Sequence, residues 1–176
     1  MDTIRIFAYG SLLKETSLRK TVPDAKDIYP ARVFGFRRVF NLASHYRFCE
    51  TTGAPVCVLN LEQQEPEAAM NGICFEMDRG SIESLVSREQ IYSMHPVTAH
   101  DYHGARPKQT AFLFWASDHE PYRYLAGSEA QRHYLNLCLR GCEVFGARFL
   151  EDFRASTAFW AIDSAEEIER IWQGEY

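Results

Sequence analysis

Hydrophobic and polar residues alternate in several short runs along the first two thirds of the chain. The first run, from Ile4 to Tyr9, reads Ile-Arg-Ile-Phe-Ala-Tyr and stops at a glycine and a serine. A period of two is typical of a β-strand with one buried face. Five further strands are predicted at Ala31–Leu42, Val56–Glu62, Gly72–Met77, Val97–His103 and Thr110–Ala116.

The last third of the chain changes to a helical pattern. Ser128-Glu129-Ala130-Gln131 has the form of a capping box, which predicts a helix from there to about Phe145, where Gly146 can end it. Ser164-Ala165-Glu166-Glu167 repeats this signal. A terminal helix is predicted to follow it, with one apolar face and a closing glycine: Ile168, Ile171, Trp172 and Gly174.

Strands followed by helices predict an α+β fold, with a small mixed, curved sheet or barrel and flanking helices. The 176 residues fit a single domain, 1–176, with a helical C-terminal part from about 128. The stretches Ala43–Pro55 and Ala116–Gly127 lack periodicity. We expect them to be loops at the mouth of a pocket, because binding residues concentrate on such connections.

The first strand ends at Tyr9-Gly10-Ser11-Leu12, which is the first candidate functional segment. Gly10 allows a sharp turn or the close approach of a ligand, and successive backbone N–H groups in such a turn can hold a carboxylate. The hydroxyl of Ser11 adds a donor or an acceptor. An ordinary turn after a first strand explains the same residues, so a second signal is needed.

That signal lies in the segment from Ser81 to Tyr92, which is predicted to be a short helix capped by Ser81. Its apolar stripe of Ile82, Leu85 and Val86 continues to Glu89, whereas Glu83, Arg88 and Gln90 can face water. A partly buried carboxylate has a raised pKa and suits proton transfer. A structural alternative is a salt bridge from Glu89 to a core arginine, for which Arg5, Arg37, Arg38 and Arg106 are candidates.

In order and spacing the two segments resemble the γ-glutamylcyclotransferase-like superfamily, which includes γ-glutamylcyclotransferases, γ-glutamylamine cyclotransferases and ChaC-like enzymes. Phe7-Ala8-Tyr9-Gly10-Ser11-Leu12 is similar to the N-terminal loop of the family, and Leu85-Val86-Ser87-Arg88-Glu89 to the segment that ends in its catalytic glutamate. The intervening strands and the helix at 134–142 fit the same order. Many relatives have Asn after the loop serine or Gly after the glutamate, where this chain has Leu12 and Gln90.

The resemblance implies a γ-glutamyl cyclotransferase, in which the substrate α-amine attacks its own γ-amide carbonyl and yields 5-oxoproline and a free amine. It implies Glu89 as the catalytic base and acid, and Tyr9, Gly10, Ser11 and Leu12 as substrate-binding residues. Tyr92, expected one helical turn beyond Glu89, is a further substrate-binding candidate and Tyr102 a weaker one, and a role in the core explains either ring equally well. No cofactor and no metal are expected, and the particular γ-glutamyl amide is left open.

Composition agrees with a small soluble enzyme. The net charge of −5 argues against nonspecific nucleic-acid binding, and no apolar run resembles a membrane span or a secretory signal. We therefore expect a cytoplasmic protein whose partner is a small γ-glutamyl amide, with no nucleic acid and no membrane. The five cysteines are expected to be reduced thiols. The sequence carries no signal for an oligomeric state.

Three other interpretations compete with catalysis by Glu89. His95, His100 and His103 are close in sequence, but on a strand His100 and His103 would point to opposite faces. Cys49 or Cys57 could pair with a distant histidine, although no local pattern activates either thiol. The fold could also serve as a noncatalytic module that binds a small anion or interacts with a partner. The cost of burying Glu89 argues against that last alternative.

Overall fold

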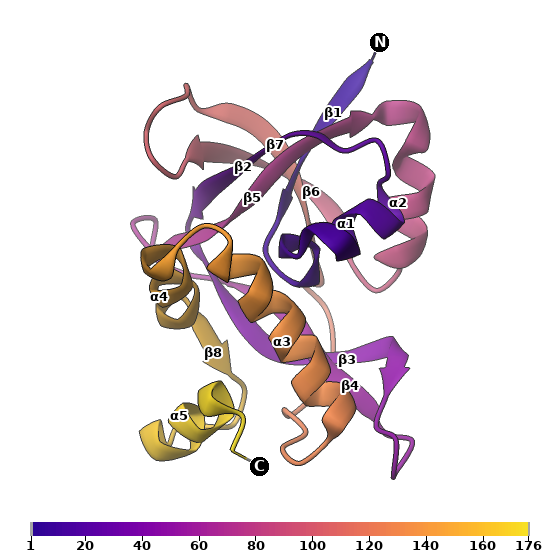
Figure 1. Ribbon diagram of the computed structural model, residues 1–176, viewed down its shortest axis with the longest axis vertical. Helices are drawn as coiled ribbons and strands as arrows, with labels where there is room; N and C mark the ends of the chain where they lie inside the picture. The colour runs from indigo at the N-terminus through magenta and orange to yellow at the C-terminus, as the bar shows by residue number, and fades with distance from the viewer. Residues whose placement is uncertain (1, 176) are drawn as a thin grey trace.

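Two β-sheets organise the chain, and the computed structural model describes residues 2–175. Strands β1, β5, β2, β6 and β7 close into a barrel, and β4, β3 and β8 form a second sheet. Figure 1 shows the barrel above and the long β3–β4 hairpin below it, with α3 crossing in front. The elements are β1 (Thr3–Ala8), η1 (Ser11–Leu13), α1 (Glu15–Thr21), β2 (Lys26–Phe34), β3 (Phe36–Phe48), β4 (Pro55–Gln63), β5 (Ala69–Asp78), η2 (Arg79–Ser81), α2 (Ile82–Arg88), β6 (Ser93–Asp101), β7 (Gln109–Trp115), α3 (Glu129–Glu143), α4 (Ala147–Ala155), β8 (Thr157–Phe159) and α5 (Ala165–Gln173).

The barrel follows from the alternation of apolar residues along its strands. In β1, Ile4 and Ile6 are buried inside, whereas Arg5 is only partly buried and is paired in register with Glu76 of β5. β1 pairs antiparallel with β5 and parallel with β7, which closes the cylinder. The predicted α+β fold with a curved sheet or barrel and flanking helices is therefore confirmed.

One predicted strand is wrong. The run Ala31–Leu42 divides at Gly35 into β2, which belongs to the barrel, and β3, which belongs to the second sheet. Gly35 has φ of +81°, a backbone conformation that strongly favours glycine. Its N–H donates to the Ala68 carbonyl and its carbonyl accepts from Gln64, both at 2.8 Å. This turn lets the two halves of one apolar run enter different sheets.

The two serine caps predicted in the last third of the chain are confirmed. The Ser128 hydroxyl accepts from the Gln131 N–H at 3.2 Å, and Ser164 accepts from Glu167 at 3.3 Å. The Gln131 side chain does not complete the capping box, because its amide bonds to both backbone groups of Cys57. Helix α3 ends at Glu143, and Gly146 precedes α4, a helix that the sequence pattern did not predict.

Helix α3 packs directly on the turn that follows β1 (Figure 1). A Cβ atom at Gly141 would lie 2.5 Å from the Leu13 carbonyl carbon and 2.6 Å from the Lys14 nitrogen. Only a glycine therefore fits at this contact without displacing backbone atoms. Gly141 thus brings α3 against η1, and the position of η1 is determined by the helix as well as by the barrel.

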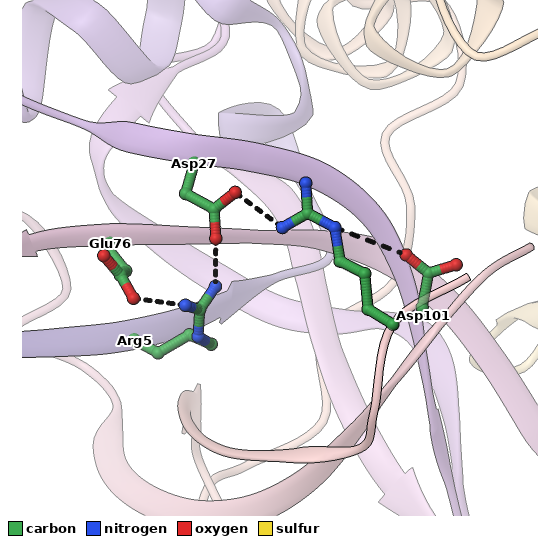
Figure 2. A network of polar contacts seen from close by, with 5 residues as sticks. Arg5, Asp27, Glu76 and Asp101 are labelled. Atoms are coloured by element: carbon green, nitrogen blue, oxygen red, sulfur yellow. Dashed lines mark hydrogen bonds and ion pairs between the residues drawn. The ribbon is translucent and has the colours of Figure 1, made fainter. Parts of the chain in front are cut away.

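Ion pairs connect four strands, β1, β2, β5 and β6, and the β6–β7 connection on the outer wall of the barrel (Figure 2). Arg5 pairs with Glu76 and, at 3.1 Å, with Asp27. Arg106 pairs with Asp27 at 2.5 Å and with Asp101 at 3.8 Å. Burial opposes ionisation of Asp27, but the two guanidinium groups outweigh it and lower the pKa of this carboxyl group. We call these five residues the outer network.

Among residues 2–175, no helix is long and apolar enough to cross a membrane. All five cysteines lie in the described part of the chain, where they are buried and form no disulfide.

Candidate active site

A pocket opens where β1 ends, between the barrel and the β3–β4 hairpin. Its space is about 590 Å³ counted out to the open mouth. Among the described residues that line it, only Glu89 is charged. The lining consists of Ile6, Phe7, Ala8, Tyr9, Gly10, Ser11, Leu12, Ser44, Tyr46, Val58, Leu59, Glu89, Ile91, Tyr92, Phe114 and Tyr134. The structure therefore brings together six of the residues predicted from the sequence, Tyr9, Gly10, Ser11, Leu12, Glu89 and Tyr92, but not Tyr102. Their roles in binding and catalysis remain predictions.

The segment after β1 is a short 3₁₀ turn. The first hydrogen bond of this turn runs from the Leu13 N–H to the Gly10 carbonyl at 3.0 Å. The N–H groups of Ser11 and Leu12 precede it and are not used by the hydrogen bonds of the turn. The space beside Gly10 is narrow, because a Cβ atom there would lie 3.3 Å from the Tyr134 hydroxyl of α3. Gly10 therefore admits a side chain of α3 to the pocket wall.

A buried arginine supports this turn from behind. Arg38 of β3 is fully buried, and its Nε donates to the Tyr9 carbonyl at 3.0 Å. Its other nitrogens donate to the Ser156 hydroxyl at 2.6 Å and to the backbone and side-chain oxygens of Asn71. Burial lowers the pKa of Arg38 to about 10, which leaves the guanidinium charged at neutral pH. Arg38 therefore does not pair with Glu89; it anchors the loop.

Glu89 does not lie within a helix, which corrects the prediction of one helix from Ser81 to Tyr92. Helix α2 ends at Arg88, and Glu89 follows it with φ of −96° and ψ of 32°. Its N–H still donates to the Leu85 carbonyl at 2.9 Å, so its side chain continues the Leu85 face into the pocket. The side chain is 17% exposed. Two other details were wrong: Ser81 makes no side-chain cap, and Val86 is 46% exposed.

Arg88 does not face water, contrary to the sequence-based expectation. Its Nε lies 3.3 Å from Glu89 Oε1. Its other nitrogens donate to the hydroxyl groups of Thr21 at 2.6 Å, Ser11 at 3.0 Å and Ser17 at 3.3 Å. One planar guanidinium group therefore contacts both Glu89 and Ser11. This contact places the carboxylate and the loop hydroxyl beside the same group, and it makes Arg88 the partner of Glu89.

Burial raises the pKa of Glu89, while the positive charges of Arg88 and Arg47 act in the opposite direction. The hydroxyl groups of the neighbouring Tyr9 and Tyr92 are protonated at neutral pH. Burial raises the pKa values of Tyr9 and Tyr92 well above the usual value, and the charge of Glu89 adds to the effect on both. Among the described residues that line the pocket, Glu89 is therefore the group best suited to accept and return a proton.

Two of the pocket tyrosines use their hydroxyl groups to bond the walls. Tyr9 Oη donates to the Phe114 carbonyl at 2.5 Å, and Tyr92 Oη donates to the Leu59 carbonyl at 2.7 Å. Tyr102 lies outside the pocket, where its hydroxyl donates to Asp152 at 2.5 Å and its ring packs on Phe149. Of the two tyrosines considered from the sequence, Tyr92 lines the pocket and Tyr102 does not.

Several functional candidates carried no local signal in the sequence. Tyr134 reaches the pocket from α3, and Ser44 and Tyr46 reach it from the far half of β3. Each of them lies within a segment whose pattern is explained by a helix or a loop. They are far from Glu89 along the chain, so no sequence pattern shows that they share a pocket with it. Arg38 was recognised only as a possible partner of Glu89, and its contact with the Tyr9 carbonyl was not predicted.

The structure also bears on the two alternatives raised from the sequence, a metal site and a reactive cysteine. Among residues 2–175 no group of three or more potential ligands is placed to hold a metal ion. Neither Cys49 nor Cys57 lines the pocket. Burial raises the pKa of Cys57 to about 12, which disfavours a reactive thiolate. Cys49 differs from the sequence-based expectation, because hydrogen bonds with Thr51 and Thr52 in the β3–β4 turn lower the pKa of its thiol to about 6, but this thiol lies away from the pocket lining.

No protein-family model matches the sequence, and no curated protein matches it. Solved structures match the fold over nearly the whole chain. One is a γ-glutamyl cyclotransferase with a TM-score of 0.71 and 18% identity, in which 98% of this chain and 99% of that chain are covered. An uncharacterised protein from Homo sapiens has a TM-score of 0.70 and 20% identity, with the same coverage of both chains. A yeast γ-glutamyl cyclotransferase described as specific to glutathione has a TM-score of 0.64 and 15% identity, and the match covers 99% of this chain and 96% of that chain. The chain therefore has the γ-glutamylcyclotransferase-like fold that the sequence motifs predict.

Proposed function

We propose that this protein is a γ-glutamyl cyclotransferase with Glu89 as its general base and acid. One observation carries the proposal. Among the described residues, Glu89 is the single charged group in the lining of a pocket that also contains the loop Tyr9–Leu12, and Arg88 contacts both the carboxylate and the Ser11 hydroxyl. The solved γ-glutamyl cyclotransferases of the same fold support it.

The loop is suited to hold the glutamyl end of the substrate. The N–H groups of Ser11 and Leu12 precede the first bond of η1, and the Ser11 hydroxyl lies beside the cationic Arg88. Backbone donors and a hydroxyl next to a positive charge are a suitable environment for the substrate α-carboxylate. Arg38 and α3 keep these donors in place, so little ordering is required when the substrate binds.

The reaction needs one proton relay. As the α-amine nitrogen bonds to the γ-carbonyl carbon, Glu89 accepts a proton from that nitrogen. The bond from the γ-carbon to the leaving nitrogen then breaks, and Glu89 returns the proton to that nitrogen. The products are 5-oxoproline and a neutral amine, and the carboxylate is regenerated. Because both reacting groups belong to one molecule, the pocket can accelerate the reaction mainly by holding them in contact in the reactive geometry.

A panel of γ-glutamyl amides tests the proposal, with glutathione, γ-glutamyl amino acids and γ-glutamyl alkylamides as members. We expect release of 5-oxoproline, detected by mass spectrometry, from at least one of them by the wild type. Glu83→Gln, on the exposed face of α2, is the matched control for loss of a carboxylate. If no member is turned over while one binds to the pocket, the protein is an anion-binding module and the proposal is wrong.

A further inference from the structure

Strand β3 bulges beside the pocket. Ala43 pairs with Cys57 and Phe48 pairs with Pro55, so five steps along β3 face two steps along β4. The Ser44 hydroxyl stabilises the extra residues by accepting from the N–H groups of Tyr46 at 3.3 Å and Arg47 at 3.0 Å. Bulges of this kind redirect side chains near functional sites. We call Ser44–Arg47 the β3 bulge.

The β3 bulge forms the solvent side of the pocket. Ser44 and Tyr46 line it, and Tyr46 is 47% exposed, which places its ring at the rim. The Arg47 guanidinium carbon lies 5.2 Å from the centroid of the Tyr46 ring and 5.4 Å from that of Tyr134. Its charge also lowers the pKa of Glu89. Arg47 is not itself part of the pocket lining, but its positive charge lies beside two rings of the pocket wall, one of them at the rim.

Arg47 has no carboxylate partner among the ion pairs of residues 2–175. Its Nε is buried without an acceptor. Glu50, Glu129 and His133 line the next hollow together with Arg47. The Glu50 carboxylate is occupied, since it accepts from the N–H groups of Glu129 and Ala130 and from the Ser128 hydroxyl. The guanidinium group thus has donors to spare at the rim.

We propose that Arg47 is a specificity-determining residue that selects leaving amines with a carboxylate close to the scissile nitrogen, as in α-amino acids. This inference rests on the proposed function. With the glutamyl end held by Ser11 and the γ-amide at Glu89, the leaving amine extends toward the β3 bulge. A carboxylate there pairs with Arg47, a neutral group leaves the buried donor unsatisfied, and a cation is repelled.

Three substrates of nearly equal size test this directly: γ-glutamylglycine, its neutral glycinamide analogue and the cationic 2-aminoethylamide. For the wild type we expect kcat/KM to fall in that order, with about 10-fold to 100-fold between the anion and the neutral amide. We expect Arg47→Gln to lose the preference for the anion while retaining turnover of the glycinamide analogue. Arg47→Lys should keep part of the preference, since the charge remains.

Arg37→Gln is the matched control, because Arg37 lies on the exposed face of the same strand. It should leave the ratio unchanged. If the wild type turns over all three substrates equally, or if Arg47→Gln lowers all three rates in the same proportion, the inference about Arg47 is wrong and the proposed function stands. If neither these three substrates nor any member of the wider panel of γ-glutamyl amides releases 5-oxoproline, both are wrong. The ratio in the wild type remains a test even if the variants do not fold.

Discussion

The outer network and the pocket use charge in opposite ways. In the outer network, each of Arg5, Asp27 and Arg106 has two partners of opposite sign (Figure 2). The carboxylates of Asp27 and Glu76 are 35% and 33% exposed and retain access to water. In the pocket, Glu89 has one partner, Arg88, and burial raises its pKa. Arg38 behind it is fully buried and bonds only to neutral oxygens.

The difference separates a stabilising role from a functional one. Partly exposed pairs contribute little to stability, because water screens them and long side chains lose freedom on pairing. A buried and underpaired carboxylate costs folding free energy, which is a common feature of sites that exchange protons. Substitutions in the pocket should therefore alter activity and pH dependence, whereas substitutions in the outer network should alter stability slightly and only at low salt.

The largest effect is expected for Glu89→Gln. The amide is nearly the same size but cannot accept a proton, so 5-oxoproline release should fall ~10²–10⁴-fold. Substrate affinity measured by calorimetry should change far less. A variant that releases 5-oxoproline as fast as the wild type would remove Glu89 from the mechanism.

The same variant has a stability signature. The pKa of Glu89 is raised in the folded state, so the protonated carboxyl group contributes to the free energy of unfolding. This contribution is complete below the pKa of the unfolded chain and is lost as pH rises through the folded-state pKa. Glu89→Gln has no such titration. Its free energy of unfolding relative to the wild type should therefore increase with pH, as measured by urea denaturation.

The next largest effect is expected for Arg38→Met. Methionine leaves the oxygens of Tyr9, Asn71 and Ser156 without this donor inside the protein, which should cost about 3 kcal/mol or more. Urea denaturation measures the loss. Arg37→Met, one residue earlier and exposed, is the control and should change the free energy of unfolding by no more than about 0.5 kcal/mol. Equal effects of the two substitutions would show that Arg38 does not anchor the loop.

A pH effect is expected for Arg88→Met. Arg88 favours the ionised form of Glu89, so its removal should raise the pKa of that carboxyl group further. Because only the carboxylate accepts the amine proton, the acid limb of the kcat/KM profile should move to higher pH. Arg88→Lys should restore part of the shift. A profile that keeps its midpoint while its plateau falls would assign Arg88 to the support of Ser11 alone.

The smallest effect is expected for Asp27→Asn in the outer network. Asp27 has φ of +46°, which asparagine tolerates, so the substitution removes charge without straining the backbone. We expect a loss of less than about 1 kcal/mol, measured by urea denaturation. At about 1 M salt, where charges are screened within roughly 3 Å, the loss should shrink. Turnover should not change. A loss of activity would contradict the separation of the two regions.

Much of the fold was predictable because its signals are local. The alternation in Ile4–Tyr9 predicted β1, the apolar run Val56–Glu62 predicted β4, and the serines at 128 and 164 marked the starts of two helices. The division at Gly35 was missed, since an apolar run shows only that residues are buried. Whether its two halves share a sheet depends on the strands that pair with them.

The sequence by itself determined the loop Tyr9–Leu12 and the inward side of Glu89, because a strand end and the Leu85 face are properties of neighbouring residues. Only the tertiary structure decided the partner of Glu89, the anchoring of the loop by Arg38 and the entry of Tyr134 beside Gly10. Periodicity reports which face of a segment is buried. It carries no information on which distant group covers that face, and contacts between distant groups set the charge and shape of this pocket.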